Sequence, residues 1–213
     1  MTRSLLLLAL LLPVLALAKP PSSKEVDEAL LRLSPGDLSE VDAGQRAVVA
    51  AEAAQAAVEQ DIAFAKNDIK AAKSWDEASA AVLKALRHEQ EAAQARQDDE
   101  ELTRLARVGG DAESNAAWRK ARTKQHEARL AFDQARLAHA KTSLALIQAE
   151  YQVTRMEAYA RAVGQSGDVD TELGKRHTSV GKAKKQDARA ATKRDKAEDA
   201  WKTASLEAER LSP

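Results

Sequence analysis

Two long stretches of this chain contain no residue that would interrupt an α-helix. Residues 45–108 and 111–163 include neither proline nor glycine, and alanine recurs throughout both. Alanine is the strongest helix former, whereas glycine costs about 1 kcal/mol in a helix interior and proline removes a helical hydrogen bond. The sequence therefore predicts one helix from about residue 39 to residue 108 and another from about residue 114 to residue 163.

The turn between these helices is predicted at Gly109-Gly110-Asp111, where glycine supplies a C-cap and aspartate caps the next helix. A turn this short makes the helices antiparallel, so residue i of the first lies opposite about residue 221 − i of the second. In this register the segment Val41–Ala57 overhangs the second helix. Such an alanine-rich segment is only marginally stable alone, so either residues 24–33 or a second chain must cover it.

Apolar residues of the first helix follow the seven-residue repeat of a coiled coil. Their steps alternate between four and three at Val58, Ile62, Ala65, Ile69 and Ala72. We interpret Trp75 as a seam residue at a shift in phase of the repeat, with an exposed contact for another chain as the alternative. The overhang together with this repeat predicts a homo-oligomer whose seam includes Val41, Val48, Val58 and Ile62.

The second helix carries two apolar stripes. One includes Trp118, Phe132 and His139 in steps of three and four, and the other includes Leu130, Leu137, Leu144, Tyr151 and Ala158 in steps of seven. Two stripes indicate two neighbouring helices, which would place this helix in the middle. The predicted fold class is all-α: an elongated antiparallel coiled-coil hairpin with a third, weaker helix and no β-sheet.

Four segments follow from these patterns. Residues 1–18 combine Arg3, an apolar run and an Ala-x-Ala cleavage site, which is typical of a cleaved signal peptide and predicts a periplasmic or secreted protein. Residues 19–38 form a Pro/Ser linker with a short helix, and residues 39–163 form the hairpin. Residues 164–213 form the third helix, which is basic and then alanine-rich and is interrupted early by Gly174 and Gly181. Loose packing of this helix on the hairpin is an open alternative.

No residue pattern in the sequence indicates catalysis, a cofactor or a metal. The chain has no cysteine, which excludes thiol chemistry and disulfides. No two of the four histidines lie three or four residues apart, as a zinc site on one helix face requires. We interpret His139 as a polar residue that fixes the register between helices. The expectation is a protein that is not an enzyme, with no catalytic, cofactor-binding or metal-binding residues.

Charge is distributed unevenly, although 33 basic residues balance 33 acidic residues over the whole chain. Residues 175–196 carry nine lysines or arginines against two aspartates, whereas residues 89–101 carry six acids against one arginine. The basic segment predicts a contact with an anionic lipid or lipopolysaccharide surface, with a solvated face as the alternative. The candidate contact residues are Lys182, Lys184, Lys185, Arg189, Lys193 and Arg194. Nucleic acid is not expected, because no aromatic residues alternate with these cations.

The functional prediction is a non-enzymatic coiled-coil protein of the cell envelope that acts as a spacer, scaffold or adaptor. Two alternatives stay open. The first is a periplasmic holdase-type chaperone, and the second is a helical sensor or ligand-binding bundle. The partner is expected to be a second copy of the chain or another envelope protein.

Overall fold

A computed structural model describes residues 21–164 and 166–213. The protein is all-α, with no strand among these residues. The helices are α1 (Ser23–Leu30), α2 (Pro35–Arg96), α3 (Asp99–Val163) and α4 (Gly167–Arg210). The predicted signal peptide lies outside the described residues, as do the first two residues of the linker.

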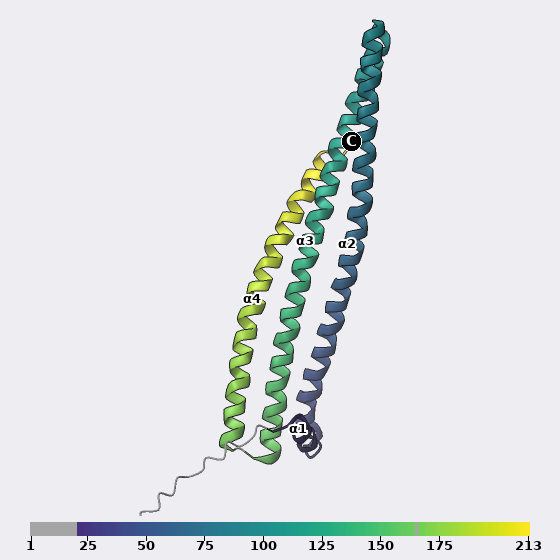
Figure 1. Cartoon of the computed structure of the whole chain (residues 1–213). Helices are drawn as coiled ribbons and strands as arrows, with labels where there is room; N and C mark the ends of the chain where they lie inside the picture. The colour runs from purple at the N-terminus through teal and green to yellow at the C-terminus, as the bar shows by residue number, and fades with distance from the viewer. Residues whose placement is uncertain (1–20, 165) are drawn as a thin grey trace, which may run out of the picture.

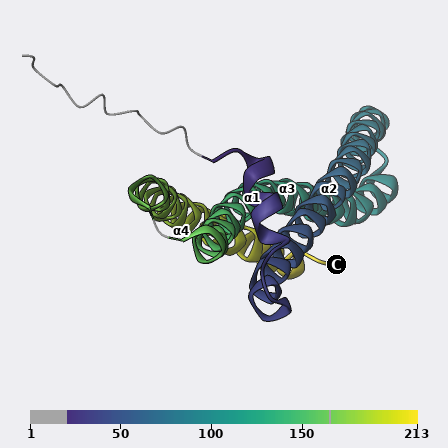
Figure 2. The ribbon, with the colours of Figure 1, turned by 90° about the horizontal axis from the view of Figure 1, so that it is seen from below.

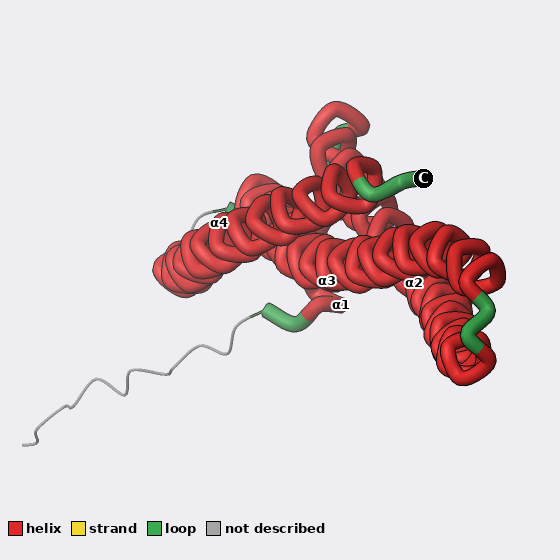
Figure 3. The backbone as a smooth tube through the Cα atoms, turned by 90° about the horizontal axis from the view of Figure 1, so that it is seen from above, coloured by secondary structure: helices red, strands yellow, loops and turns green. Residues whose placement is uncertain are grey.

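The three long helices lie side by side along the length of the molecule (Figure 1). Nearly all contacts between helices involve α3, which packs against α2, α4 and α1. Seen along their length, α2 and α4 flank α3 and diverge from each other, so the three helices form an open layer (Figures 2 and 3). With 65 residues at 1.5 Å each, α3 is roughly 100 Å long.

The two stripes of the central helix do face two different neighbours. On the first stripe, Phe132 stacks on Trp201 of α4, with the ring centroids 5.5 Å apart and the planes at 10°. On the second, the Tyr151 hydroxyl donates to Gln45 of α2 at 2.6 Å. The predicted middle position of this helix is therefore confirmed.

The turn between α2 and α3 lies at residues 97–98, so the predicted turn at Gly109-Gly110-Asp111 is wrong. Gln97 has a positive φ of 57°, and the Asp98 side chain caps α3 by accepting from the Glu101 backbone N–H at 3.0 Å. Three acidic residues in the first turn, Asp99–Glu101, favour a helix start because they face its positive end. The acidic residues at 98–101 therefore determine where the turn lies, and Gly109 and Gly110 lie inside α3.

The earlier turn changes the register of the hairpin by about 26 residues. Arg119 donates to the Trp75 carbonyl and Gln90 donates to the Leu105 carbonyl, both at 3.4 Å, so residue i lies opposite about residue 195 − i. Because α2 has 62 residues and α3 has 65, the predicted overhang of Val41–Ala57 does not exist. Val41 instead packs with Ala158 of α3.

The short N-terminal helix α1 covers the start of α2 and the end of α3. Ser22 and Glu25 form a reciprocal capping box that starts α1. Val26 and Leu30 of α1 are buried against Val41 and Ala158. The sequence left two alternatives for covering this end, residues 24–33 or a second chain. In the structure the chain's own N-terminal helix covers it.

The third long helix is continuous from Gly167 to Arg210 and is not interrupted at Gly174 or Gly181. The Ser166 side chain caps its start, where Val169 packs with Met156 and Ala160 of α3. Hydrogen bonds and stacked rings then join α4 to α3 along most of its length. A loosely packed third helix is therefore not what the structure shows.

Candidate interaction surfaces

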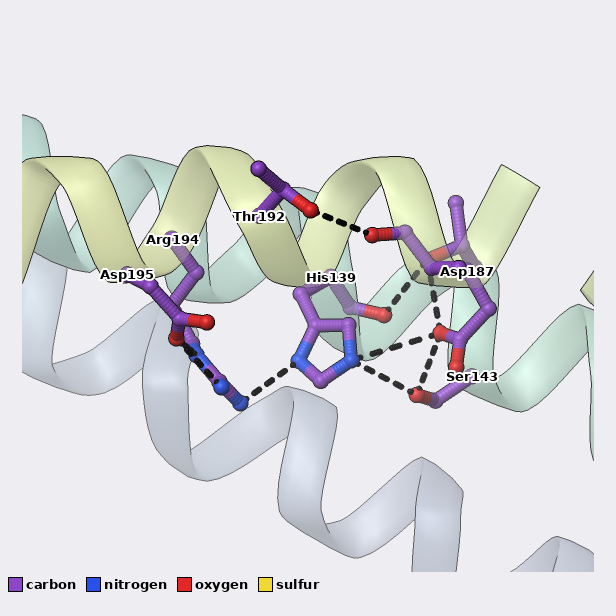
Figure 4. A network of polar contacts seen from close by, with 8 residues as sticks. His139, Ser143, Asp187, Thr192, Arg194 and Asp195 are labelled. Carbon is purple, nitrogen blue, oxygen red and sulfur yellow. Dashed lines mark hydrogen bonds and ion pairs between the residues drawn. The ribbon is translucent and has the colours of Figure 1, made fainter. Parts of the chain in front are cut away.

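A polar cluster around His139 joins α3 to α4 (Figure 4). The Ser143 hydroxyl donates to Asp187 Oδ1 at 2.7 Å, and Thr142 Oγ1 lies 3.0 Å from the same oxygen. His139 Nε2 lies 3.4 Å from Asp187 Oδ1, and Arg194 Nη1 lies 3.2 Å from His139 Nδ1. The position of His139 between two helices agrees with the predicted role in fixing their register.

This cluster contains serine, histidine and aspartate, but its hydrogen bonds are not those of a catalytic triad. In a triad the serine and the aspartate contact opposite ring nitrogens of the histidine. Here Ser143 and Asp187 both lie at Nε2, and the serine proton goes to the carboxylate. On the other side of the ring, Nδ1 faces the Arg194 guanidinium, which can only donate, and not the carboxylate that faces this nitrogen in a triad.

A buried carboxylate lies at the α2–α3 interface. Asp133 is 2% exposed, and its Oδ1 lies 2.9 Å from Arg136 Nη1, which also bonds Asp61 of α2 at 3.0 Å. Burial alone would lower the pKa of Arg136, but the hydrogen bonds with the two aspartates outweigh it and raise that pKa. The cluster fixes α2 on α3 through charge, where alanine-rich faces offer little apolar area.

A groove between α2 and α3 contains two tryptophans. It encloses about 400 Å³ and is lined by Asp68, Ala71, Ala72, Trp75, Trp118, Arg119, Arg122 and His126. Trp75 is 61% exposed, and the Arg119 guanidinium lies 5.0 Å from the centre of its ring. The prediction that Trp75 is a seam residue is therefore wrong. Its exposure agrees with the alternative, in which Trp75 contacts another chain, and that contact stays a prediction.

His126 is the titratable residue in this groove with a shifted pKa. Burial is the largest cause and lowers the pKa below its ordinary value, and the nearby charge of Arg122 adds to the effect. Asp68 acts in the opposite direction but more weakly. His126 is therefore neutral at neutral pH, and the groove's cationic character comes from its two arginines.

Beyond the end of α4, α2 and α3 continue as a two-helix arm, which we define as residues 76–96 and 99–119 (Figure 1). The hydrogen bond from Gln125 to Ser205 aligns α4 with α3. From there α3 extends about 20 residues past the end of α4, or roughly 30 Å. Leu105 is fully buried in the arm, whereas Val82 is 53% exposed.

The basic residues of α4 divide into two groups. Lys184 pairs with Glu150 of α3 at 3.3 Å, and Arg194 contacts Asp195 and His139. Lys182, Lys185, Arg189 and Lys193 are exposed, and no ion pair involves them among residues 21–164 and 166–213. Four of the six predicted contact residues therefore remain free to meet a partner.

Helical geometry places these four residues on one face with two further lysines. At 3.6 residues per turn, six cations lie within about 80° of one another. We call them the α4 cation stripe: Lys175, Lys182, Lys185, Arg189, Lys193 and Lys196. Only Lys175 among them has an ion pair in the described chain, with Glu172 at 3.7 Å. No acid of α4 between residues 175 and 196 lies on this face.

The predicted oligomer seam lies largely inside a single chain. Val41, Val58 and Ile62 are buried, and Val48 is half-buried. Their burial within one chain removes the reason for expecting a second copy over this part of α2.

Within 21–164 and 166–213, no group of three histidine, aspartate or glutamate side chains gathers as a metal site would require. No helix in the same part of the chain is long and apolar enough to cross a membrane. Neither a family model, nor a curated protein, nor a solved structure matches this chain.

Sequence reasoning missed two of these features for different reasons. Asp133 is polar and does not belong to either apolar stripe of α3, so the sequence pattern did not predict its burial. Only the corrected register places it opposite Asp61 of α2. The groove also depends on register, because Trp75 and Trp118 meet only when the turn lies at 97–98. The excess of basic residues between 175 and 196 is visible in the sequence. Their angles around a helix axis would also have shown which of them share the face of the α4 cation stripe.

Proposed function

We propose that this chain is a non-enzymatic spacer or adaptor of the cell envelope, built on an antiparallel coiled-coil hairpin whose arm reaches a protein partner. The arm is the observation that carries the proposal, because about 30 Å of two-helix structure extends past the third helix. A catalytic domain needs a preorganised pocket on a rigid support. A two-helix arm instead provides reach with little buried area.

Three further features support the proposal. The signal peptide predicted at residues 1–18 would direct the chain out of the cytoplasm. The Ser143–His139–Asp187 cluster ties α4 to α3 and lacks the proton path of a triad. Val82 and Val108 are apolar side chains of the arm that solvent reaches, at 53% and 38% exposure, and a protein partner would cover them.

The test is photo-crosslinking in the producing cell, with a photoreactive amino acid in place of Val82 on the arm. The matched control places it at Leu206 on α4, which is similarly exposed at 67% but lies outside the arm. We expect a defined crosslinked species of one size from Val82 and none from Leu206.

A second variant tests reach separately from sequence. Removing residues 80–86 and 109–115 deletes one heptad from each helix, keeps the 195 − i register, and shortens the arm by roughly 10 Å. Because this deletion removes Val82, the photoreactive residue is placed instead at Val108, which the deletion retains and which is 38% exposed. For a spacer, the crosslink from Val108 should weaken or disappear in the shortened arm while helicity per residue is retained.

Other outcomes would replace the proposal. A ladder of adducts with many unfolded envelope proteins from both positions would indicate the holdase chaperone. Protection of a denatured outer-membrane protein from aggregation at equal molar ratio would support the same conclusion. Adducts confined to cytoplasmic proteins would contradict export and therefore the envelope role.

A further inference from the structure

The exposed face of α4 carries positive charge that, apart from the Lys175–Glu172 pair, no ion pair in the described chain neutralises. From Lys175 to Lys196 the α4 cation stripe runs for 21 residues, or roughly 30 Å along the helix axis. Lys182, Arg189 and Lys196 repeat every seven residues, so their Cα atoms are spaced by about 10 Å. Helix α4 meets α3 through Ala190, Asp187 and Trp201, which lie on a different face.

Any partner that neutralises the whole stripe has to be extended and anionic. A single phosphate or a small anion reaches one or two of the cations and leaves the others unneutralised. The cations of the stripe repel one another, and this repulsion is relieved fully only when negative charge lies along the whole stripe. The partner must therefore present negative charge over roughly 30 Å or more.

The side chains between the cations show what kind of recognition this face supports. Thr178 lies within the sector of the cations, Gln186 and Thr192 lie about 20° outside its two edges, and no aromatic or large aliphatic residue lies in the sector between residues 175 and 196. Protein interfaces depend on buried aromatic or arginine anchors, and single-stranded nucleic acids are bound through stacking on aromatic rings. Lysines on flexible stems act as point charges and need no fixed geometry of acceptors.

We propose that the α4 cation stripe binds the phosphate-bearing headgroups of an anionic lipid surface, with the helix lying along the membrane without inserting. A fluid headgroup layer supplies charge over any length and can adapt to the spacing of the cations. It requires no apolar anchor, and this face offers none. The inference deepens the spacer proposal by naming the surface on which the body of the protein rests.

The test is co-sedimentation of the mature full-length chain with vesicles. One set contains phosphatidylcholine alone, and in the other set phosphatidylglycerol replaces part of it. We expect binding only to the phosphatidylglycerol vesicles, lost at about 1 M salt, where the Debye length falls to about 3 Å. Each cation near such a surface contributes roughly fivefold to the binding constant.

The test variant is Lys182→Gln, Arg189→Gln and Lys196→Gln combined, and it should bind roughly 100-fold more weakly. The matched control removes the same charge from exposed lysines of α3 by combining K120Q, K124Q and K141Q, and it should bind within about threefold of the parent. Replacing the three stripe residues by other cations, through Lys182→Arg, Arg189→Lys and Lys196→Arg, should preserve binding. Circular dichroism establishes that each variant keeps its helices.

Several results would overturn the inference. Equal loss in both triple-glutamine variants would mean that net charge matters and the stripe does not. Binding to polyphosphate without binding to vesicles would assign the face to a soluble linear polyanion. No binding to either would assign it to solvent. None of these results alters the crosslinking test at Val82, so failure here and failure of the spacer proposal remain distinguishable.

Discussion

Replacing Gly110 by alanine gives opposite results for the two possible positions of the hairpin turn. Gly110 lies within α3, and an added Cβ would have no heavy atom within 4 Å. Alanine is about 1 kcal/mol better than glycine in a helix interior, so Gly110→Ala should stabilise the arm by about that amount. In a turn at 109–111 with glycine in the left-handed region, alanine would instead cost about 1 kcal/mol or more.

Hydrogen exchange measured by mass spectrometry resolves the difference, because the arm opens locally and global unfolding need not report it. Peptides covering residues 100–120 should exchange roughly fivefold more slowly in Gly110→Ala than in the parent. The control is Gly164→Ala, where φ is 89°, so alanine should accelerate exchange around the α3–α4 turn. Faster exchange of the arm in Gly110→Ala would refute the turn at 97–98 and restore the 221 − i register.

Three other substitutions test the packing and titration described above. Leu105→Ala removes a fully buried side chain of the arm and should cost about 3 kcal/mol locally; unchanged hydrogen exchange in the arm would contradict this. Phe132→Ala and Trp201→Ala should couple by about 1 kcal/mol in a double-mutant cycle by urea unfolding, because the rings stack, and additive effects would argue against the stack. The folded protein lowers the pKa of His126, so it binds fewer protons than the unfolded chain. The contribution of His126 to the free energy of unfolding is therefore present above about pH 6.5 and is lost as the pH falls towards the pKa of His126 in the folded protein. His126→Gln should flatten the dependence of the urea midpoint on pH across this range.

Helix content and the central position of α3 could be predicted because they depend on features repeated over many residues. Stripes such as Leu130–Leu137–Leu144 extend over several turns, so a local error does not hide them. The turn could not be predicted in the same way. Two adjacent glycines are a strong signal for a turn, but three consecutive acids after Asp98 stabilise a helix start, and the sequence does not state which effect is larger.

The register error led to the prediction of an uncovered segment, because with the turn at 109–111 Val41 appeared uncovered. The seam assignment of Trp75 had a separate cause, since it came from the spacing of apolar residues up to Ala72. With the turn at 97–98, Val41 is buried beneath α1 and Trp75 faces a groove beside Trp118. The prediction of self-association depended on the uncovered segment Val41–Ala57, and the structure removes that reason because the segment is covered. The basic character of α4 survived, because charge in one helix does not depend on how other helices pair.

The opposite charges of the arm and of α4 give this neutral chain a permanent electrical polarity. The stripe lies beside α3 near residues Ser143 and Glu150, whereas the acidic residues around Asp98 lie at the far end of the arm. About 45 residues of α3 separate them, or roughly 70 Å. Close to a negatively charged surface, within the Debye length of about 10 Å at 0.1 M salt, this separation of charge would favour an orientation with α4 towards the surface and the tip of the arm away from it. A net charge of zero is therefore compatible with a preferred orientation on approach to a charged surface.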